Sequence, residues 1–298
     1  MTEDVSTATP RQWLAGARPQ TLPAAITPVI VGSALAHADG GFALVPAVLA
    51  LVVALALQVG VNYANDYSDG IRGTDKDRVG PLRLVGSGLA RPKDVRAAAF
   101  VSFALAAVAG LVLVIISQQW WLIAVGVASI LAAWFYTGGK KPYGYLGLGE
   151  VFVFVFFGLV AVCGTTLVQL GRISLLSVIG AVGVGCWTTA ILVANNLRDI
   201  NGDTTAGKVT LAVRIGDRAT RWLYLILVAV AVAALVAVSA LTTWWGLLAL
   251  VGPLLIIPSV RSVLRGAVGR DLISVLKATG RFEVLAALGL AIGMIIGA

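Results

Sequence analysis

The sequence predicts an all-α polytopic membrane protein, and three of its properties support that fold class. Hydrophobic residues make up 59% of the 298 positions and charged residues only 12%, which is about half the charged fraction of ordinary soluble domains. Mean hydropathy is +0.94, so the apolar surplus has to be solvated by lipid rather than packed into one soluble core. The apolar stretches are also too long and too uniform for the alternating strands of a membrane barrel. We therefore expect spanning helices, which satisfy their own backbone polar groups.

Nine apolar runs have the length, about 17 to 25 residues, that crosses a bilayer core as a helix. In chain order they fall at 21–38, 42–64, 97–117, 119–137, 149–169, 175–196, 222–241, 244–260 and 277–297. The first run contains Pro23 and Pro28, and the last contains Arg281 and Glu283, so these two give the weakest signal. We expect the whole chain, residues 1–298, to form a single transmembrane domain.

The distribution of cations predicts the orientation of these helices. With nine spans, the N-terminus and the connections after even-numbered spans lie on one side of the membrane. That side holds 21 of the 22 Lys and Arg residues, and only Arg172 falls in the opposite connections. Because cationic loops are retained in the cytoplasm, we expect a multi-pass protein of the cell membrane whose cationic side is cytoplasmic. The net charge of +8 then follows from topology and attraction to anionic lipid, without a nucleic-acid partner.

Two connections on the predicted cytoplasmic side, 65–96 and 197–221, are long, polar and rich in both signs of charge. The connections on the other side are turns of a few residues. Long loops on a rigid scaffold commonly carry binding and catalytic residues. We therefore expect these two Asp-rich loops to form an active site that faces the cytoplasm.

An acidic cluster ends the second apolar run, where the chain reads Asn62-Tyr-Ala-Asn65-Asp66-Tyr-Ser-Asp69. At about 3.6 residues per turn, Asn62, Asp66 and Asp69 share one face of a helix. The run of apolar residues therefore ends in stacked oxygen-bearing side chains.

The sixth apolar run ends in a second acidic cluster, with Asn195, Asp199 and Asp203 at successive spacings of four residues. Asp66 and Asp199 are separated by 133 positions, so the two clusters form an imperfect internal repeat. Ionisable residues at the ends of membrane spans are costly, and their recurrence favours a function over ordinary helix capping.

The chemistry of the two clusters predicts a diphosphate–metal site. Carboxylates on one helix face repel each other unless a cation lies between them. Carboxylate and amide oxygens, with no His or Cys nearby, favour a hard ion, and Mg²⁺ held together with substrate phosphates fits this donor set. Neighbouring Arg and Lys residues can bind the phosphate oxygens. For Asp75 and Asp77, in the first loop, surface ion pairing is an equally good interpretation.

These motifs resemble those of the UbiA superfamily of intramembrane aromatic prenyltransferases. The resemblance extends over nearly the whole chain and implies nine helices around a central cavity. The NDxxD motif at 65–69, the segment 73–83 and the RPxT motif at 18–21 look most like the branch that uses 1,4-dihydroxy-2-naphthoate as acceptor. The commoner superfamily pattern places a third acid four residues after Asp69, where this chain has Gly73. Whether Asp75 or Asp77 binds the metal instead is left open.

The resemblance implies transfer of a polyprenyl group from polyprenyl diphosphate to 1,4-dihydroxy-2-naphthoate, with release of pyrophosphate and CO₂. The product would be demethylmenaquinone, in menaquinone biosynthesis. The implied metal ligands are Asn62, Asn65, Asp66, Asp69, Asn195, Asp199 and Asp203. The implied diphosphate contacts are Arg72, Arg78, Arg198, Lys76, Arg83 and Lys208. Tyr136 and Lys140 are similar to a Tyr/Lys pair that the superfamily places near the diphosphate, and complete the catalytic set with the four Asp residues of the clusters.

The expected reaction produces an allylic cation, which aromatic faces and a water-poor cavity would protect. The available aromatic side chains are Tyr63, Tyr67, Tyr136, Tyr143, Tyr145 and Trp187. Another acceptor, 4-hydroxybenzoate or homogentisate, is an alternative within the superfamily. An ion-coupled transporter is a more distant one, because transporters also combine many helices with acidic residues. The sequence leaves open the prenyl chain length, the partner of the acceptor carboxylate and the oligomeric state.

Overall fold

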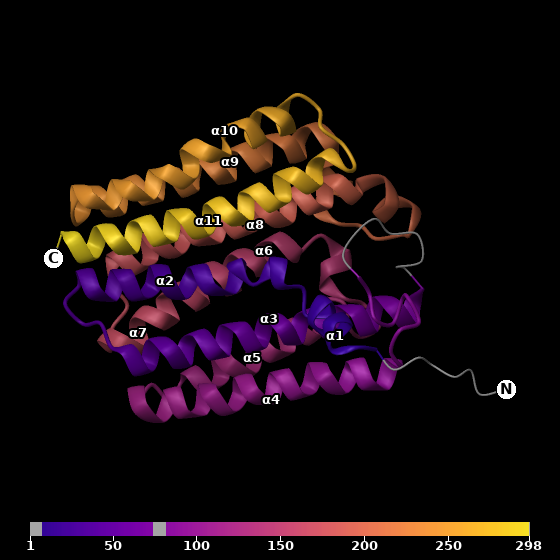
Figure 1. Ribbon diagram of the computed structural model, residues 1–298, viewed down its shortest axis with the longest axis horizontal. Coiled ribbons are helices and arrows are strands. Elements are labelled where there is room, and N and C mark those ends of the chain that lie inside the picture. Colours follow the sequence, from indigo (N-terminus) through magenta and orange to yellow (C-terminus); the bar gives the residue numbers. More distant parts are fainter. Residues whose placement is uncertain (1–7, 74–81, 298) are drawn as a thin grey trace.

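The computed structural model describes residues 8–73 and 82–297, and every regular element within these ranges is a helix (Figure 1). In chain order the elements are α1 Pro10–Gly16, η1 Pro19–Thr21, α2 Pro23–Ala38, α3 Leu44–Arg72, α4 Pro92–Ser117, α5 Leu122–Phe135, η2 Tyr143–Leu146, α6 Gly149–Val153, η3 Phe154–Cys163, α7 Gly164–Leu170, α8 Leu175–Thr205, α9 Leu211–Leu241, η4 Trp244–Leu250, α10 Val251–Leu264 and α11 Asp271–Ile296. The predicted all-α membrane fold is thereby confirmed.

Each of the nine apolar runs lies on helix, but the number of full spans differs from the expectation. In the described part of the chain, seven helices are long and apolar enough to cross a membrane. The α1–η1 segment and α2 add an eighth span if the pair, which is bent by 50°, is counted as one. The bend falls where Pro23 begins α2, since proline is favoured in the first turn of a helix but cannot continue one from before. The count of nine stays a prediction.

The fourth expected span, 119–137, contains only the 14-residue helix α5. At 1.5 Å per residue this helix is about 21 Å long, which is less than the roughly 30 Å hydrocarbon core. Gln118 in a left-handed conformation (φ 56°) ends α4, and α5 begins four residues later. The two tryptophans in this short turn, Trp120 and Trp121, are exposed, as interfacial residues are expected to be.

Helices α3 and α8 continue beyond the apolar runs and into the two segments that we expected to be loops. α3 extends to Arg72 and ends at Gly73, whose left-handed backbone (φ 71°) lets its N–H bond back to the carbonyls of Asp69 and Gly70. α8 extends to Thr205. Both acidic clusters therefore lie on the last turns of helices, in agreement with the helical spacing of their residues.

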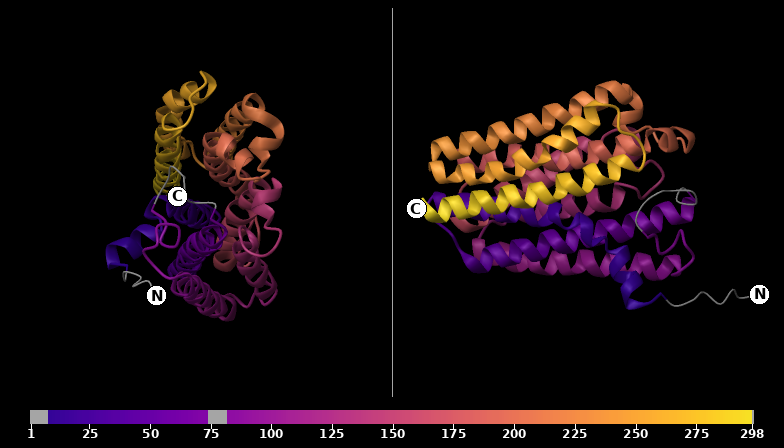
Figure 2. Two further views of the ribbon diagram at one scale, coloured as in Figure 1. Left: turned by 90° about the vertical axis from the view of Figure 1, so that its right-hand side faces the viewer. Right: turned by 45° about the horizontal axis from the view of Figure 1, so that its top comes forward.

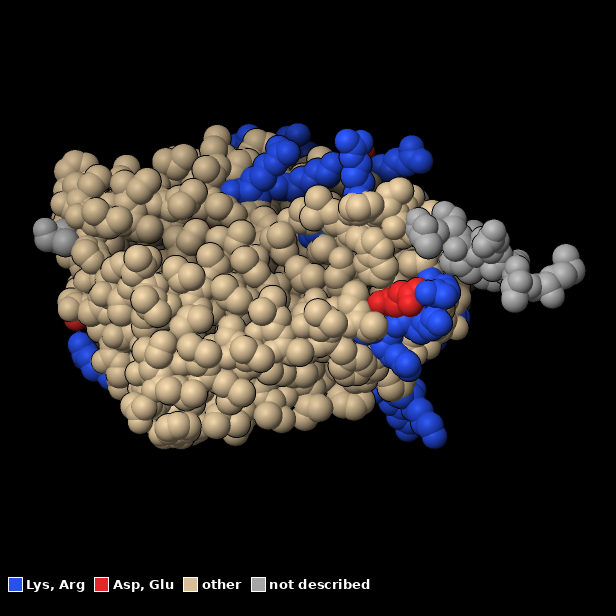
Figure 3. Space-filling view, turned by 60° about the horizontal axis from the view of Figure 1, so that its bottom comes forward, with Lys and Arg blue, Asp and Glu red and all other residues tan. Residues whose placement is uncertain are grey.

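The helices run along a common axis, and the ends of α3 and α8 lie at the same end of the bundle (Figures 1 and 2). We call this end, which also holds the starts of α4 and α9, the polar end. Figure 3 shows Lys and Arg side chains gathered toward this end beside a broad surface without charge. Many large apolar side chains of the bundle are exposed, among them Phe100, Val101 and Leu105 on α4, as expected for helices that face lipid.

Two buried clusters pack α8 against its neighbours: one joins α8 to α9, α10 and α11, and the other also includes residues of α2 and η3. Where α8 crosses η3, a Cβ added to Gly158 would lie 2.6 Å from Ala181 O and from Gly185 Cα. Only glycine permits this approach, in agreement with the close packing expected of the glycine-rich spans. Trp187 lies in this core, where its indole N–H donates to Thr279 O at 3.0 Å.

Candidate active site

The first acidic residue of α3, Asp66, is completely buried and anchors the chain that returns toward α4. Its Oδ2 accepts the backbone N–H of Leu84 at 2.7 Å, and its Oδ1 accepts that of Val85 at 3.0 Å. Val85 packs so closely on Gly70 that an added Cβ would meet Val85 Cγ1 at 2.4 Å. Asp66 therefore fixes the segment that carries Arg83 against the last turn of α3.

Asp69, one turn further along α3, is the point where four separate segments meet. Tyr145 of η2 donates its phenol hydrogen to Asp69 Oδ1 at 2.5 Å. Arg83 Nη2 lies 3.6 Å from Asp69 Oδ2, and Lys208 Nζ, from the link between α8 and α9, lies 3.9 Å from Oδ1. Asp69, Arg83 and Lys208 are all buried, so these charges interact with little screening by water.

The ring of Tyr145 organises the cations around Asp69. Lys208 Nζ lies 4.5 Å from the centroid of this ring, and the Arg72 guanidinium carbon lies 5.6 Å from it. The Tyr145 carbonyl also accepts the backbone N–H of Val209 at 3.1 Å. Three of the predicted diphosphate contacts, Arg72, Arg83 and Lys208, are thus brought together around one carboxylate and one aromatic ring.

The second acidic cluster is joined to the first through Lys208. The Lys208 side chain reaches Asp69, while its backbone N–H donates to Asp203 O at 2.8 Å. Within the second cluster, Arg198 grips Asp199 with both Nε (2.7 Å) and Nη2 (2.6 Å), and Nη2 also donates to Asn195 Oδ1 at 2.9 Å. Lys208 therefore connects the end of α8 to Asp69 on α3.

The donor set at this end of the bundle fits a hard divalent ion that is shared with a diphosphate. Among the described residues, no three His, Cys, Asp or Glu side chains are close enough to hold a metal by themselves. The carboxylates of Asp69 and Asp199 each have a cation of the chain beside them. Because these carboxylates are few and already paired, a metal bound here would need phosphate oxygens as further ligands. Mg²⁺, which keeps several non-protein ligands, binds in that way.

Two of the predicted metal ligands are engaged elsewhere in this structure. The Asn62 amide nitrogen donates to Ala17 O and to Thr21 Oγ1, both at 2.9 Å. Asn65 Oδ1 accepts the hydroxyl hydrogen of Thr137 at 2.7 Å. Both amides therefore link α3 to neighbouring segments.

The pair Tyr136 and Lys140 occupies two different surroundings. Tyr136 lines the cavity described below, whereas Lys140 is exposed. Arg72 donates to the carbonyls of Thr137 and Gly139, which fixes the backbone directly before Lys140. The remaining predicted basic and acidic residues of the first loop, Asp75, Lys76, Asp77 and Arg78, lie outside the described residues.

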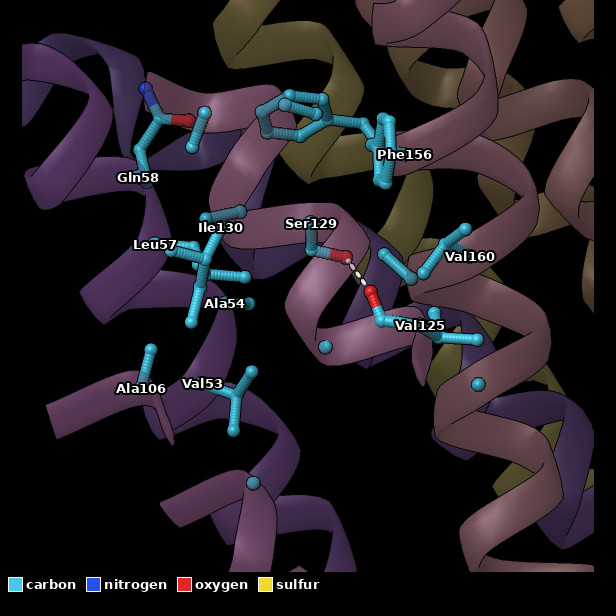
Figure 4. Close-up of a pocket in the computed structure, with 18 of the residues that line it drawn as sticks. Val53, Ala54, Leu57, Gln58, Ala106, Val125, Ser129, Ile130, Phe156 and Val160 are labelled. Carbon is cyan, nitrogen blue, oxygen red and sulfur yellow. Dashed lines mark hydrogen bonds between the residues drawn. The ribbon is translucent and has the colours of Figure 1, made fainter. Parts of the chain in front are cut away.

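A cavity of about 530 Å³ extends from the polar end into the bundle, between α2, α3, α4, α5, η3 and α7. Figure 4 shows apolar side chains of α3, α5 and η3, among them Leu57, Ile130 and Val160, around this space. At its polar end it is lined by Gln58, Asn62, Asn65, Tyr136 and Tyr143. Since Asn65 precedes Asp69 by one helical turn, the cavity begins beside the acidic site.

Apart from Tyr145, which lies beside Asp69, the aromatic residues that we expected near the reaction divide into two groups. Tyr136 and Tyr143 line the cavity with their rings edge to face at 5.5 Å. Burial raises the pKa of the Tyr143 phenol, which therefore keeps its hydrogen and donates it to Ala132 O at 2.8 Å. Tyr63, Tyr67 and Trp187 pack elsewhere: Tyr63 donates to Trp13 O, Tyr67 stacks on Trp134, and Trp187 belongs to the α8 core.

Sequence reasoning missed two polar contacts of this end of the bundle. The Tyr145–Asp69 contact joins residues 76 positions apart. Glu150, at the start of α6, accepts the amide hydrogen of Asn196 on α8 at 2.8 Å rather than facing a basic residue. Neither pair has a characteristic spacing. Glu150 and Asn196 are signalled only as an acid and an amide beside apolar stretches, and Tyr145 has no signal of this kind.

Comparison with known proteins agrees with this arrangement. The model of the UbiA prenyltransferase family matches residues 25–278. A protein of Mycobacterium tuberculosis named 1,4-dihydroxy-2-naphthoate octaprenyltransferase is 54% identical over 94% of this chain and 95% of its own length. A protein of the same name from Escherichia coli is 38% identical over 89% and 88%.

Solved structures share the fold at low sequence identity. A UbiA homolog from Archaeoglobus fulgidus, solved with GPP and Mg²⁺, aligns with a TM-score of 0.71 and 15% identity over 96% of this chain and 99% of its own. A UbiA homolog from Aeropyrum pernix aligns with a TM-score of 0.71 and 16% identity over 94% and 98%. With its family match, its relatives and its helix-end acids, the chain belongs to the UbiA prenyltransferase family.

Proposed function

We propose that this protein transfers a polyprenyl group from polyprenyl diphosphate to 1,4-dihydroxy-2-naphthoate, releasing pyrophosphate and CO₂ and yielding demethylmenaquinone. The observation that supports this most directly is the apolar cavity of about 530 Å³ that begins beside Asp69. A molecule with a long hydrocarbon chain and an anionic head matches this combination. The choice of acceptor rests on relatives of 54% and 38% identity that bear the name of that reaction.

The diphosphate would bind at the polar end through residues of both acidic clusters. Mg²⁺, when bound, would neutralise charge that develops on the departing pyrophosphate. We assign its protein ligands to Asp66, Asp69, Asp199 and Asp203. Asp69 and Asp199 are the strongest candidates, since both oxygens of Asp66 already accept backbone hydrogen bonds.

Cations of the chain would hold the phosphate oxygens directly. Arg83 and Lys208 lie beside Asp69, and Arg198 lies beside Asp199. Each can exchange a carboxylate partner for a phosphate, because guanidinium and ammonium groups bind both anions. Arg72, Lys140, Lys76 and Arg78 complete the proposed set.

The prenyl chain would occupy the cavity, with its reactive end near Tyr136 and Tyr143. The faces of these rings would stabilise positive charge on the allylic carbon, and the apolar walls would exclude water that could capture it. We propose that the polar end faces the cytoplasm, where soluble acceptor and Mg²⁺ are supplied.

Purified protein in liposomes tests this function. We expect conversion of 1,4-dihydroxy-2-naphthoate and a polyprenyl diphosphate, detected by chromatography of radiolabelled prenyl product, which EDTA stops and Mg²⁺ restores. Asp66→Ala and Asp199→Ala should each abolish turnover. The matched control is Asp94→Ala, which removes an exposed carboxylate paired with Arg91 and should leave the rate unchanged. Full activity in both cluster variants, or prenylation of 4-hydroxybenzoate in preference to the naphthoate, would contradict the assignment.

A further inference from the structure

Gln58 places a polar amide on the wall of the largely apolar cavity, beside Asn62. The residue lies on α3, one turn before Asn62, and only 7% of it is exposed. Its side-chain oxygen, Oε1, has no hydrogen-bond partner among the described residues. Figure 4 shows this oxygen pointing from α3 into the space lined by α5 and η3. A buried acceptor without a donor costs free energy, so its position calls for a ligand.

Hydrogen bonds on the other side of α3 fix the orientation of this amide. The Thr21 hydroxyl donates to Arg18 O at 3.0 Å, so Thr21 Oγ1 can only accept further bonds. The terminal atom of Gln58 that lies 3.0 Å from Thr21 Oγ1 has to donate a hydrogen, so it must be the amide nitrogen Nε2. Asn62 is oriented in the same way, because its amide group contacts both Ala17 O and Thr21 Oγ1. With its nitrogen facing these acceptors, Gln58 has to turn its oxygen toward the cavity.

The other polar side chains at this end of the cavity have different partners. The Asn62 amide hydrogens are donated to Ala17 and Thr21, and Asn65 Oδ1 accepts from Thr137. The Tyr143 hydroxyl donates to Ala132 O. Gln58 Oε1 is thus a hydrogen-bond acceptor with no donor among the described residues, and it lies on the cavity wall that a bound substrate would touch.

The chemistry of the two substrates decides which of them this acceptor fits. This step rests on the proposed function. A polyprenyl diphosphate has a hydrocarbon chain and an ionised head that only accepts hydrogen bonds, so it offers no donor. In 1,4-dihydroxy-2-naphthoate the 1-hydroxyl stands next to the carboxylate and donates to it within the molecule, which leaves the 4-hydroxyl as the free donor.

We propose that Gln58 Oε1 accepts the hydrogen of the acceptor's 4-hydroxyl group, and that Gln58 is thereby a specificity-determining residue for para-dihydroxy aromatic acceptors. The bracing by Thr21 and Asn62 pre-orients the oxygen, so the acceptor ring binds in one register. A ring that lacks this hydroxyl leaves the buried oxygen without a donor and binds more weakly.

The test compares Gln58→Met with the unmodified protein in liposomes, since methionine has a similar length and apolar shape but offers no comparable acceptor. We expect KM for 1,4-dihydroxy-2-naphthoate to rise about 10-fold, the range of one hydrogen bond, while KM for the polyprenyl diphosphate stays the same. The inhibition constant of 1-hydroxy-2-naphthoate, which lacks the 4-hydroxyl, should not rise in the variant, because this ring makes no hydrogen bond to Gln58 that could be lost. Because the inhibition constant is measured by competition, it does not depend on how readily the ring of the analogue is prenylated.

Two further variants keep the result interpretable. Gln58→Glu places an oxygen where Gln58 Nε2 donates to Thr21 Oγ1, so it removes the bracing and should also lower the affinity for the naphthoate. Gln169→Met is the matched control: Gln169 is an amide of α7 that bonds to Ala43 N, Ser33 Oγ and Thr165 O, and its loss should not alter the preference between the two rings.

Three outcomes would overturn the inference. They are an unchanged KM for the naphthoate in a folded Gln58→Met protein, an equal loss of affinity for both rings, and a rise in KM for the prenyl donor instead. Failure of the proposed function gives a different result, because the unmodified protein would then not prenylate the naphthoate at all.

Discussion

Asp69 shows how a single carboxylate can organise an active site that several segments build together. Its oxygens contact a phenol from η2, a guanidinium from the segment before α4 and an ammonium from the α8–α9 link. Because these groups are buried, each contact depends on the others for its geometry. Removal of any one partner should therefore affect the site without unfolding the bundle.

The phenol of Tyr145 provides a first test at this scale. Tyr145→Phe keeps the ring beneath Lys208 but removes the hydrogen bond to Asp69. Hydrogen bonds to charged groups are worth more than neutral ones, so we expect kcat to fall about 10- to 100-fold. Tyr63→Phe is the control, because its hydroxyl bonds to Trp13 O away from the cavity. Equal rates for Tyr145→Phe and the unmodified protein would show that the phenol is not part of the machinery.

The sequence predicted the acidic residues of the candidate site and three of the cations near Asp69, but not the contact between Asp69 and Tyr145. Asp66, Asp69, Asp199 and Asp203 stand out because polar residues rarely end apolar helices. Tyr145 carries no such signal, since its contact with Asp69 spans 76 positions and depends on how η2 folds back. The environment of Gln58 is equally invisible, because its orientation is decided by a threonine on another segment.

At the scale of elements, α3 and α8 present the site by continuing as helices past the apolar region. A helix end is rigid, whereas the loops that we expected at 65–96 and 197–221 would have to be ordered by substrate. η3 adds a different property: its ten residues form a π-helix, which is wider than an α-helix and is frequently found at functional sites. It lines the cavity with Phe156, Phe157 and Val160.

Asp66 on α3 holds the segment before α4 through Leu84 and Val85, and it is also a proposed metal ligand. Thermal unfolding can separate these two roles of Asp66. If its main task is to hold Leu84 and Val85, then Asp66→Ala should lower the free energy of unfolding by about 2–4 kcal/mol, since two buried N–H groups lose their acceptor. The loss should be the same in EDTA and in Mg²⁺ with diphosphate. Asp199→Ala should instead leave the stability in EDTA nearly unchanged and reduce only the stabilisation that Mg²⁺ and diphosphate add. Identical behaviour of the two variants would contradict this division of roles.

For the whole molecule, the cavity sets which prenyl donors can bind. Ala50, on the same helix as Asn65, lines the cavity fifteen residues earlier, about 22 Å away along the axis. Ala50→Phe would block this far region, so we expect kcat/KM for long polyprenyl diphosphates to fall about 10-fold or more while geranyl diphosphate is used as before. Val48→Phe, on the exposed face of α3, is the control. Loss of activity with short and long donors alike would contradict the placement of the prenyl chain in this part of the cavity.

Orientation in the membrane is a second property of the whole molecule. The two native cysteines are buried, so a cysteine introduced at the surface can be labelled selectively. An impermeant maleimide should label Arg265→Cys, in the α10–α11 connection, only from the cytoplasmic side, and Arg172→Cys, before α8, only from the other side. The reverse pattern would place the active site outside the cell.

The sequence predicted the architecture better than the number of spans. Long apolar runs such as 97–117 and 277–297 became helices α4 and α11, because hydrophobic length alone determines a span. Two segments do not form the single long helix that was expected. At 21–38 the chain bends where Pro23 begins α2, and at 119–137 the turn before α5 leaves a helix of only 14 residues. Hydropathy does not report such local breaks.

The ion pairs at the polar end also bear on how the protein is made. Asp69 is balanced by Arg83 and Lys208, and Asp199 by Arg198, so the acidic helix ends do not require a bound ion to be compatible with their surroundings. Newly synthesised chains can accordingly insert and assemble before any divalent cation or isoprenoid reaches them. We therefore expect the helix bundle to assemble without a divalent cation.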